Sequence, residues 1–178
     1  SFAALGLRAA SDAPQGSIAF TNARVLTMRD EEVIARGTVV VAGNRITAVG
    51  PADAVAVPPE AKVIDLGGRT LMPGLIDMHG HIDCCYGDGL MPQKQPQHYA
   101  ALAFGVTTNF DPYSSEQQSY ESTETRLAGV SVGPRWIGSG YVIYGRAQKG
   151  DRTYVPIREY SDAERALERL AREGCNII

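Results

Sequence analysis

The first third of the chain alternates short apolar runs with turn residues. Four such runs lie at residues 18–20, 24–28, 37–42 and 46–50. Runs of this length bounded by turn residues predict β-strands, and Gly43-Asn44 between the last two predicts a hairpin. Residues 1–16 are rich in Ala, Ser, Gly and Pro, so we expect a linker or a tail from an upstream module there, followed by a small β domain over residues 17–72.

From Leu75 onward, apolar strands alternate with helical patterns. Strand-like runs lie at residues 75–78, 105–108, 133–141 and 174–178, with helical patterns at 97–104, within 117–127 and from 161 to the stop at Gly174. This order predicts an α/β domain over residues 73–178, with a parallel sheet and crossover helices. In the last helix, Ser161 and Glu164 have the spacing of a capping box. The residues expected on its apolar stripe are Ala163, Ala166, Leu167, Leu170 and Ala171.

The helix over residues 97–104 is predicted from a weaker pattern. We expect Tyr99, Leu102 and Ala103 to face the core. His98, at the start of this helix, is interpreted as a helix-start or surface residue and not as a ligand.

The candidate metal-binding residues lie at the end of the apolar run that begins at Leu75. His79 and His81 are one residue apart, and in a strand such residues point to the same face. Two imidazoles on one face, with Gly80 leaving the opposite face uncrowded, can bind one zinc-like cation. The alternative is a chance pairing in an exposed loop. Asp77 shares the face and could orient a ligand or pair with a residue of the neighbouring strand.

One segment resembles the first barrel strand of the amidohydrolase superfamily. It begins at Pro73-Gly74, continues through Leu75-Ile76-Asp77 and ends with His79 and His81. Gly105-Val106-Thr107-Thr108 is similar to the second strand, residues 133–141 to the third and 174–178 to the start of the fourth. The imidazolonepropionase and prolidase-like branch is the nearest in pattern. The resemblance implies the N-terminal part of a small β-sandwich, followed by the first half (strands 1–4) of a TIM-like (β/α)8 barrel.

For function, this resemblance implies a metal-dependent hydrolase that attacks an amide, cyclic amide or dipeptide C–N bond with metal-activated hydroxide. His79 and His81 would bind one or two divalent ions, with zinc expected and manganese, iron or cobalt as alternatives. The bridging lysine, further histidines and catalytic aspartate are expected after Ile178, so no catalytic residue is assigned within this chain. The expected partners are a small-molecule substrate, the remainder of the same protein and further copies in a homo-oligomer. The alternative function is an inactive subunit with a binding or assembly role.

Substrate contacts are expected in the loops that follow the strands. Asp83 continues the alternation of the histidine pair and could contact substrate or metal; the alternative is an exposed loop aspartate. The loop from Ile143 to Tyr160 carries Tyr144, Arg146 and Arg152. We hypothesise that Arg146 or Arg152 recognises a carboxylate-bearing substrate; the alternative is a solvated outer loop. The neighbouring Cys84 and Cys85 are expected to serve packing.

Composition narrows the range of partners. Seventeen Lys and Arg against 20 Asp and Glu give a net charge of −3, which disfavours nucleic acid and anionic membrane surfaces. No apolar run approaches the roughly 20 residues of a transmembrane helix, and no signal-peptide pattern is present in this chain. Three cysteines predict no disulfide framework and leave the compartment open between cytoplasm and periplasm, with a soluble protein expected.

Overall fold

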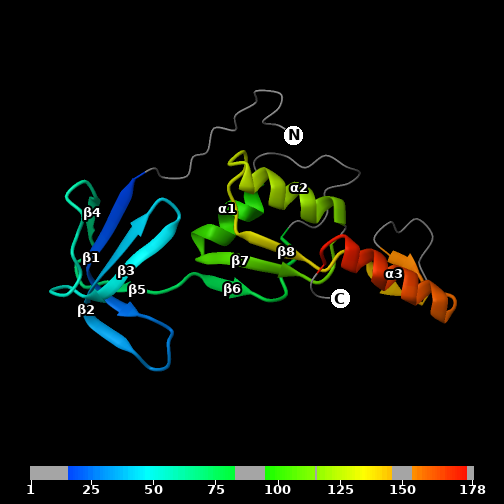
Figure 1. Ribbon diagram of the computed structural model, residues 1–178, viewed down its shortest axis with the longest axis horizontal. Helices are drawn as coiled ribbons and strands as arrows, with labels where there is room; N and C mark the ends of the chain where they lie inside the picture. The colour runs from blue at the N-terminus through cyan, green and yellow to red at the C-terminus, as the bar shows by residue number, and fades with distance from the viewer. Residues whose placement is uncertain (1–15, 83–94, 115, 146–153, 176–178) are drawn as a thin grey trace. The chain divides into compact units, whose positions relative to one another are not determined.

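A computed structural model describes residues 16–82, 95–114, 116–145 and 154–175 (Figure 1). The described residues divide into two compact units, one extending to Pro73 and the other beginning at Gly74. Within these ranges, no helix is both long enough and apolar enough to cross a membrane.

The first unit is a five-stranded sheet. Its strands are β1 (Ser17–Leu26), β2 (Val33–Ala42), β3 (Arg45–Pro51), β4 (Lys62–Asp65) and β5 (Thr70–Leu71). The order is β3-β2-β1-β4, with β5 pairing along the end of β1; β4 and β5 run parallel to β1, and the other pairs are antiparallel. The predicted hairpin is confirmed, with Gly43 at a φ of 57° in the turn between β2 and β3.

Two of the predicted strands belong to one long strand. Residues 18–20 and 24–28 were expected as separate runs, yet β1 spans both as far as Leu26. The pairing of β1 with β2 shifts register between Phe20 and Ala23, and Asn22 there has a φ of 53°. The polar Asn22 therefore marks an irregularity in the ladder and not the end of a strand.

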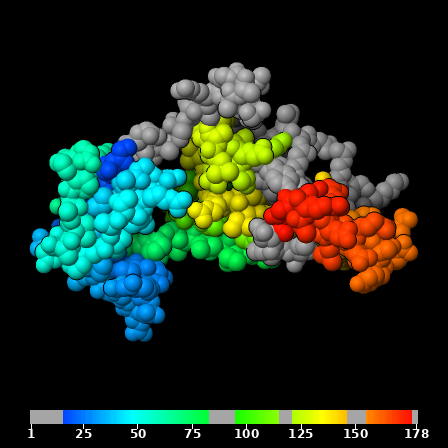
Figure 2. Space-filling view, viewed as in Figure 1, coloured from blue at the N-terminus to red at the C-terminus, as the bar shows by residue number. Residues whose placement is uncertain are grey.

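The core of this unit is small, and part of the apolar surface of its sheet is exposed. Ala23, Val25 and Val39 are buried, with Phe20 and Leu71 packed against them. Beside this core lies an apolar hollow of about 620 Å³, lined by residues that include Leu26, Ile34, Val41, Ile46, Val49 and Met72. Ile46 is 67% exposed, so part of the apolar surface of the sheet lacks a cover within the described residues. Figure 2 shows this unit in space-filling form, coloured from blue through cyan to green.

The second unit contains the predicted parallel sheet. It comprises β6 (Leu75–Asp77), α1 (Pro96–Ala103), β7 (Val106–Asp111), α2 (Glu116–Leu127) and β8 (Arg135–Gly138), and its strand order is β6-β7-β8 with parallel pairing throughout. Figure 1 shows α1 and α2 over the same side of this sheet. The alternation predicted from the sequence is confirmed for these three strands. Of the expected fourth strand, residues 176–178 lie outside the described residues.

The chain continues through two short strands and a third helix. β9 (Val142–Tyr144) pairs in parallel with β10 (Tyr154–Pro156), a small sheet that the sequence pattern did not predict. Helix α3 (Tyr160–Arg172) buries Ala166 and Leu170 of the predicted stripe. The prediction is wrong for Leu167 and Ala171, which are exposed.

The expectations for α1 are wrong in part. His98 is 4% exposed, and Tyr99 and Ala103 are on the exposed side while Leu102 is half-buried. The His98 ring lies 6.4 Å from the ring of Trp136, and a Cβ at Gly133 would come within 2.6 Å of the His98 Nδ1 atom. Because Trp136 and Gly133 provide a place for the imidazole, the helix packs through His98 and not through Tyr99.

The expected capping box of α3 is displaced by two residues. The helix begins after Glu159, and Asp162 accepts the backbone N–H groups of Arg158 at 3.0 Å and Glu159 at 3.2 Å. The Ser161 hydroxyl, predicted to cap the helix, instead donates to the Glu159 carboxylate at 2.8 Å. Glu159 and Asp162 therefore occupy the cap and third helical positions that were assigned to Ser161 and Glu164.

We predict that the first turn of α3 loosens in acid because of Asp162. The hydrogen bond from the Arg158 backbone N–H is the main cause that lowers the pKa of the Asp162 carboxyl. A lowered folded-state pKa means that the stabilisation is present above the unfolded value of about 3.9 and is lost as the pH falls through the folded-state value. Amide-exchange protection of Arg158 and Glu159 should fall over this acidic range in the wild-type protein. An Asp162→Asn control whose protection showed the same pH dependence would contradict the assignment.

Candidate metal centre

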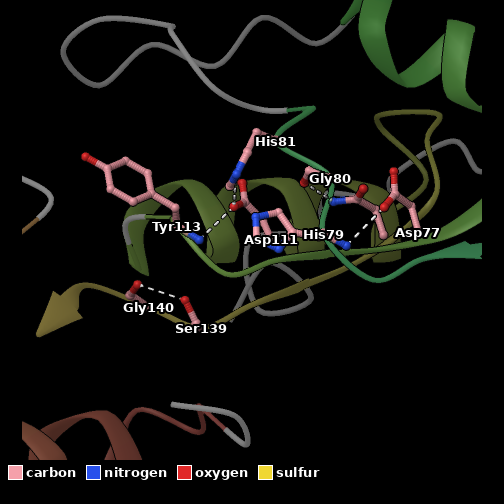
Figure 3. Close-up of polar contacts among 9 residues, drawn as sticks. Asp77, His79, Gly80, His81, Asp111, Tyr113, Ser139 and Gly140 are labelled. Carbon is pink, nitrogen blue, oxygen red and sulfur yellow. Dashed lines mark hydrogen bonds and ion pairs between the residues drawn. The ribbon is translucent and has the colours of Figure 1, made fainter.

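The histidine pair lies in the turn that follows the first strand of the parallel sheet. β6 ends at Asp77, so His79 and His81 are not strand residues, contrary to the expectation. Their rings nevertheless converge: the centroids are 5.1 Å apart and the ring planes are nearly perpendicular, at 86°. Both residues are exposed, and their side chains are drawn in Figure 3. The turn thus brings together two nitrogen donors that strand alternation was expected to align.

Gly80 holds this turn against the neighbouring strand. Its backbone N–H donates to the Phe110 carbonyl at 2.9 Å, and its carbonyl accepts the Asn109 Nδ2 group at 2.7 Å. Gly80 is buried, and a Cβ built on it would overlap the Asn109 Oδ1 atom. The expected open space beside Gly80 is therefore filled by Asn109, which is itself fully buried. The histidines project from a backbone that is fastened at the residue between them.

Asp77 contacts the main chain of the pair. Its Oδ1 atom accepts the backbone N–H of His79 at 3.0 Å. Hydrogen bonds of this kind, from a residue two positions along the chain, stabilise tight turns. Asp77 thereby shapes the turn that carries His79, and its role as an orienting residue for a metal ligand stays a prediction.

Asp111 contacts the ring of His81 and was not predicted as a site residue. It ends β7, is 1% exposed, and its Oδ1 atom lies 2.7 Å from the His81 Nδ1 atom. The same oxygen accepts the backbone N–H of Tyr113 at 2.8 Å. A signal was available in the sequence: Asn109 and Asp111 alternate directly after the strand predicted at residues 105–108, so their polar side chains fall on one face.

The chemistry of these donors fits one half of a metal site. Neutral imidazoles are common ligands of zinc, and a ligating histidine usually donates its second ring N–H to a carboxylate or carbonyl. The His81–Asp111 contact has this form. Zinc sites usually have four ligands, and within residues 16–82, 95–114, 116–145 and 154–175 no cluster of three or more His, Cys, Asp or Glu side chains could hold an ion. His79 and His81 would therefore need further ligands.

The remaining predicted site residues are not brought to this centre by the described part of the chain. Tyr144 ends β9 and its side chain is 58% exposed. Asp83, Arg146 and Arg152 lie outside the described residues, as do Cys84 and Cys85.

Comparisons with known proteins find enzymes that are similar in sequence to part of this chain. It matches no family model. It is 42% identical over 67 residues to an imidazolonepropionase of Roseobacter denitrificans, covering 35% of this chain and 17% of that protein. It is 39% identical over 62 residues to an adenine deaminase of Mesorhizobium japonicum, covering 35% of this chain and 10% of that protein.

Solved structures match over more of the chain. A prolidase complexed with N-methylphosphonate-L-proline superposes with a TM-score of 0.68 at 22% identity, covering 89% of this chain and 45% of that one. At this identity the likeness describes the fold. The chain spans less than half the length of each of these three proteins.

Proposed function

Because the chain belongs to the amidohydrolase superfamily, we propose that it supplies the first two metal ligands of a hydrolase acting on a carbon–nitrogen bond. The ligands are His79 and His81, and the expected metal is zinc. The observation that carries the proposal is the convergence of the two rings, 5.1 Å apart, where the first parallel strand ends. Ligands of parallel α/β sheets bind at the carboxyl ends of the strands, which is where this pair lies.

We propose that residues 73–178 form the first half of a barrel. The sheet β6-β7-β8 has its three strands parallel and in chain order, as in a (β/α)8 barrel. Among the described residues, β6 and β8 are the edge strands of this sheet, so further strands of the same protein would pair there. The coverage of 45% of the prolidase supports this.

A parallel argument applies to residues 17–72, which we propose to be the N-terminal part of a small β-sandwich. The open apolar hollow beside Ile46 and Met72 is a surface that a second sheet layer would cover. We propose that the cover also comes from the remainder of the protein. A tail or linker at residues 1–16 and assembly into a homo-oligomer remain predictions.

The residues of this chain have binding and orienting roles in the proposed reaction. A metal bound by His79 and His81 would supply a hydroxide nucleophile at neutral pH and polarise the scissile carbonyl or amidine. Gly80 fixes the main chain between the ligands through Phe110 and Asn109. The small-molecule substrate would approach the exposed side of the two rings. A cyclic amide, a nitrogen heterocycle or a dipeptide is the proposed substrate class, because relatives and neighbours include an imidazolonepropionase, an adenine deaminase and a prolidase.

Removal of metal is expected to abolish this activity. The full-length protein, purified without chelator, should contain about one or two zinc or similar ions per chain by elemental analysis. Dialysis against a chelator should reduce hydrolysis of a panel of imidazolonepropionate, adenine and Xaa-Pro dipeptides to background, and added zinc should restore it. A protein that bound no divalent metal would contradict the proposed site. A metal-loaded protein without activity on any C–N substrate would instead favour the binding or assembly role.

A further inference from the structure

We propose that Asp111 is a positioning residue that holds His81 with its ring hydrogen on Nδ1, so that Nε2 is the metal-binding atom. The inference rests on the proposed metal site and adds to it the identity of the donor atom and the residue that selects it. It adds Asp111 as a carboxylate that contacts a ligand ring, whereas Asp77 contacts the main chain of His79.

The position of Asp111 is fixed independently of His81. Its carboxylate is buried at the end of β7, and its Oδ1 atom also accepts the backbone N–H of Tyr113. The adjoining backbone is paired with β8, since the Asp111 carbonyl accepts the backbone N–H of Ser139 at 3.0 Å. The exposed fraction of the side chain is 2% for Asp111 and 40% for His81. The histidine ring therefore reaches from solvent to a rigid, buried acceptor.

The hydrogen bond determines the tautomer. A neutral imidazole has one N–H donor and one acceptor nitrogen, and an ionised carboxylate can only accept. With Asp111 ionised, the oxygen 2.7 Å from Nδ1 requires the hydrogen on Nδ1, which leaves the lone pair on Nε2. An exposed histidine without such a partner exchanges between both tautomers. Asp111 therefore selects the Nδ1–H tautomer of His81 before a metal binds.

Two ring contacts limit rotation of His81 about this hydrogen bond. The His79 ring lies edge-on at 5.1 Å between centroids, and the Tyr113 ring lies edge-on at 6.2 Å on a residue that also bonds to Asp111. Figure 3 shows the Asp111 carboxylate directed at the His81 ring, with Asp77 directed at the main chain of His79. Two carboxylates thus serve the turn in different ways: one contacts a ring nitrogen and the other a backbone N–H.

The test measures the tautomer and the metal affinity separately in the full-length protein. Long-range ¹H–¹⁵N spectra of the metal-free protein at about pH 8, where a free imidazole is neutral, report which ring nitrogen carries the hydrogen. The His81 signal is assigned from its disappearance in His81→Asn. We expect the Nδ1–H form in the wild-type protein and a mixture in Asp111→Ala. Zinc affinity, measured by competition with a chromogenic chelator, should fall about 10–100-fold in Asp111→Ala.

Two further variants keep the test decisive. Asp77→Asn is the matched control, because it changes a carboxylate at the same turn that contacts no ring nitrogen in the structure; His81 should keep the Nδ1–H form. If Asp111→Ala fails to fold, Asp111→Asn retains an acceptor of similar shape without the charge, and its zinc affinity should fall by a smaller factor. An Nε2–H tautomer in the wild-type protein overturns the proposal whatever the variants do. A wild-type protein that binds zinc, with Asp111→Ala binding it equally tightly, overturns it while the proposed metal site stands.

Discussion

Replacement of His81 by asparagine in the full-length protein is expected to remove the bound metal and to lower kcat/KM by about a thousandfold or more. A thousandfold loss corresponds to about 4 kcal/mol of transition-state stabilisation, a reasonable share for a metal that generates the nucleophile. Asparagine is chosen because its Nδ2 group can replace His81 Nδ1 as the donor to Asp111. The buried carboxylate then keeps a partner while the Nε2 ligand is lost. Elemental analysis and steady-state kinetics measure the two effects.

The third histidine of the chain provides the control. His98 packs beside Trp136 inside the second unit, so His98→Gln should lower the melting temperature and leave the metal content unchanged. His79→Ala should behave like His81→Asn, because one imidazole cannot replace two converging donors. Full activity in either ligand variant would show that the pair does not bind the catalytic metal.

The convergence of the two histidines could be predicted from the sequence, but its geometry could not. Alternation along a strand predicts that residues 79 and 81 share a face, and the rings do meet. The strand, however, ends at Asp77, because Gly80 bonds to Phe110 and Asn109 of β7. These bonds join residues about 30 positions apart in the sequence. A local pattern cannot place them until the pairing of β6 with β7 is known.

The same reason explains why Asp111 was missed. Asp77 is only two residues from His79 in the sequence, yet its side chain bonds to the main chain of His79 and not to a ring. Asp111 is 30 residues from His81 and reaches it only because the parallel register places Asp77 opposite Asn109 and so brings the end of β7 beside the turn. Carboxylates that end the neighbouring parallel strand are the places to search in such sequences.

The positions of the helices were predicted more accurately than the residues that the helices bury or use as caps. The three predicted helices are present. The local pattern is strongest for α3, which has cap residues at its start, and α1 has a Pro in its first turn. The buried face of α1 was wrong because His98 fits beside Trp136 and Gly133, which come from the third strand region. The cap of α3 was wrong because Glu159 and Asp162 offer the same cap spacing as Ser161 and Glu164, and local sequence does not distinguish them.

Substitution of Gly80 by alanine is expected to damage both stability and metal binding, although the backbone of Gly80 does not adopt a left-handed conformation. The added methyl group would overlap the Asn109 Oδ1 atom and approach the Asp77 Oδ2 atom to 2.7 Å. Asn109 is fully buried and bonded to the Gly80 carbonyl, so it cannot move aside without breaking that bond. Overpacking of this kind costs about 2 kcal/mol, which should lower the melting temperature by about 5 °C.

A double variant separates this collision from other effects of the methyl group. Asn109→Ala alone should destabilise the protein by about 1–3 kcal/mol, because the Gly80 carbonyl loses its buried partner. In Gly80→Ala/Asn109→Ala the obstructing oxygen is absent, so the double variant should be less destabilised than the sum of the two single changes. Gly145→Ala, where a Cβ meets nothing within 4 Å, is the matched control and should change stability by less than about 0.5 kcal/mol. Strict additivity of the Gly80 and Asn109 changes would mean that the side chain of Asn109 does not limit this position, and the histidine turn would then have to be held in place by its backbone bond to Phe110.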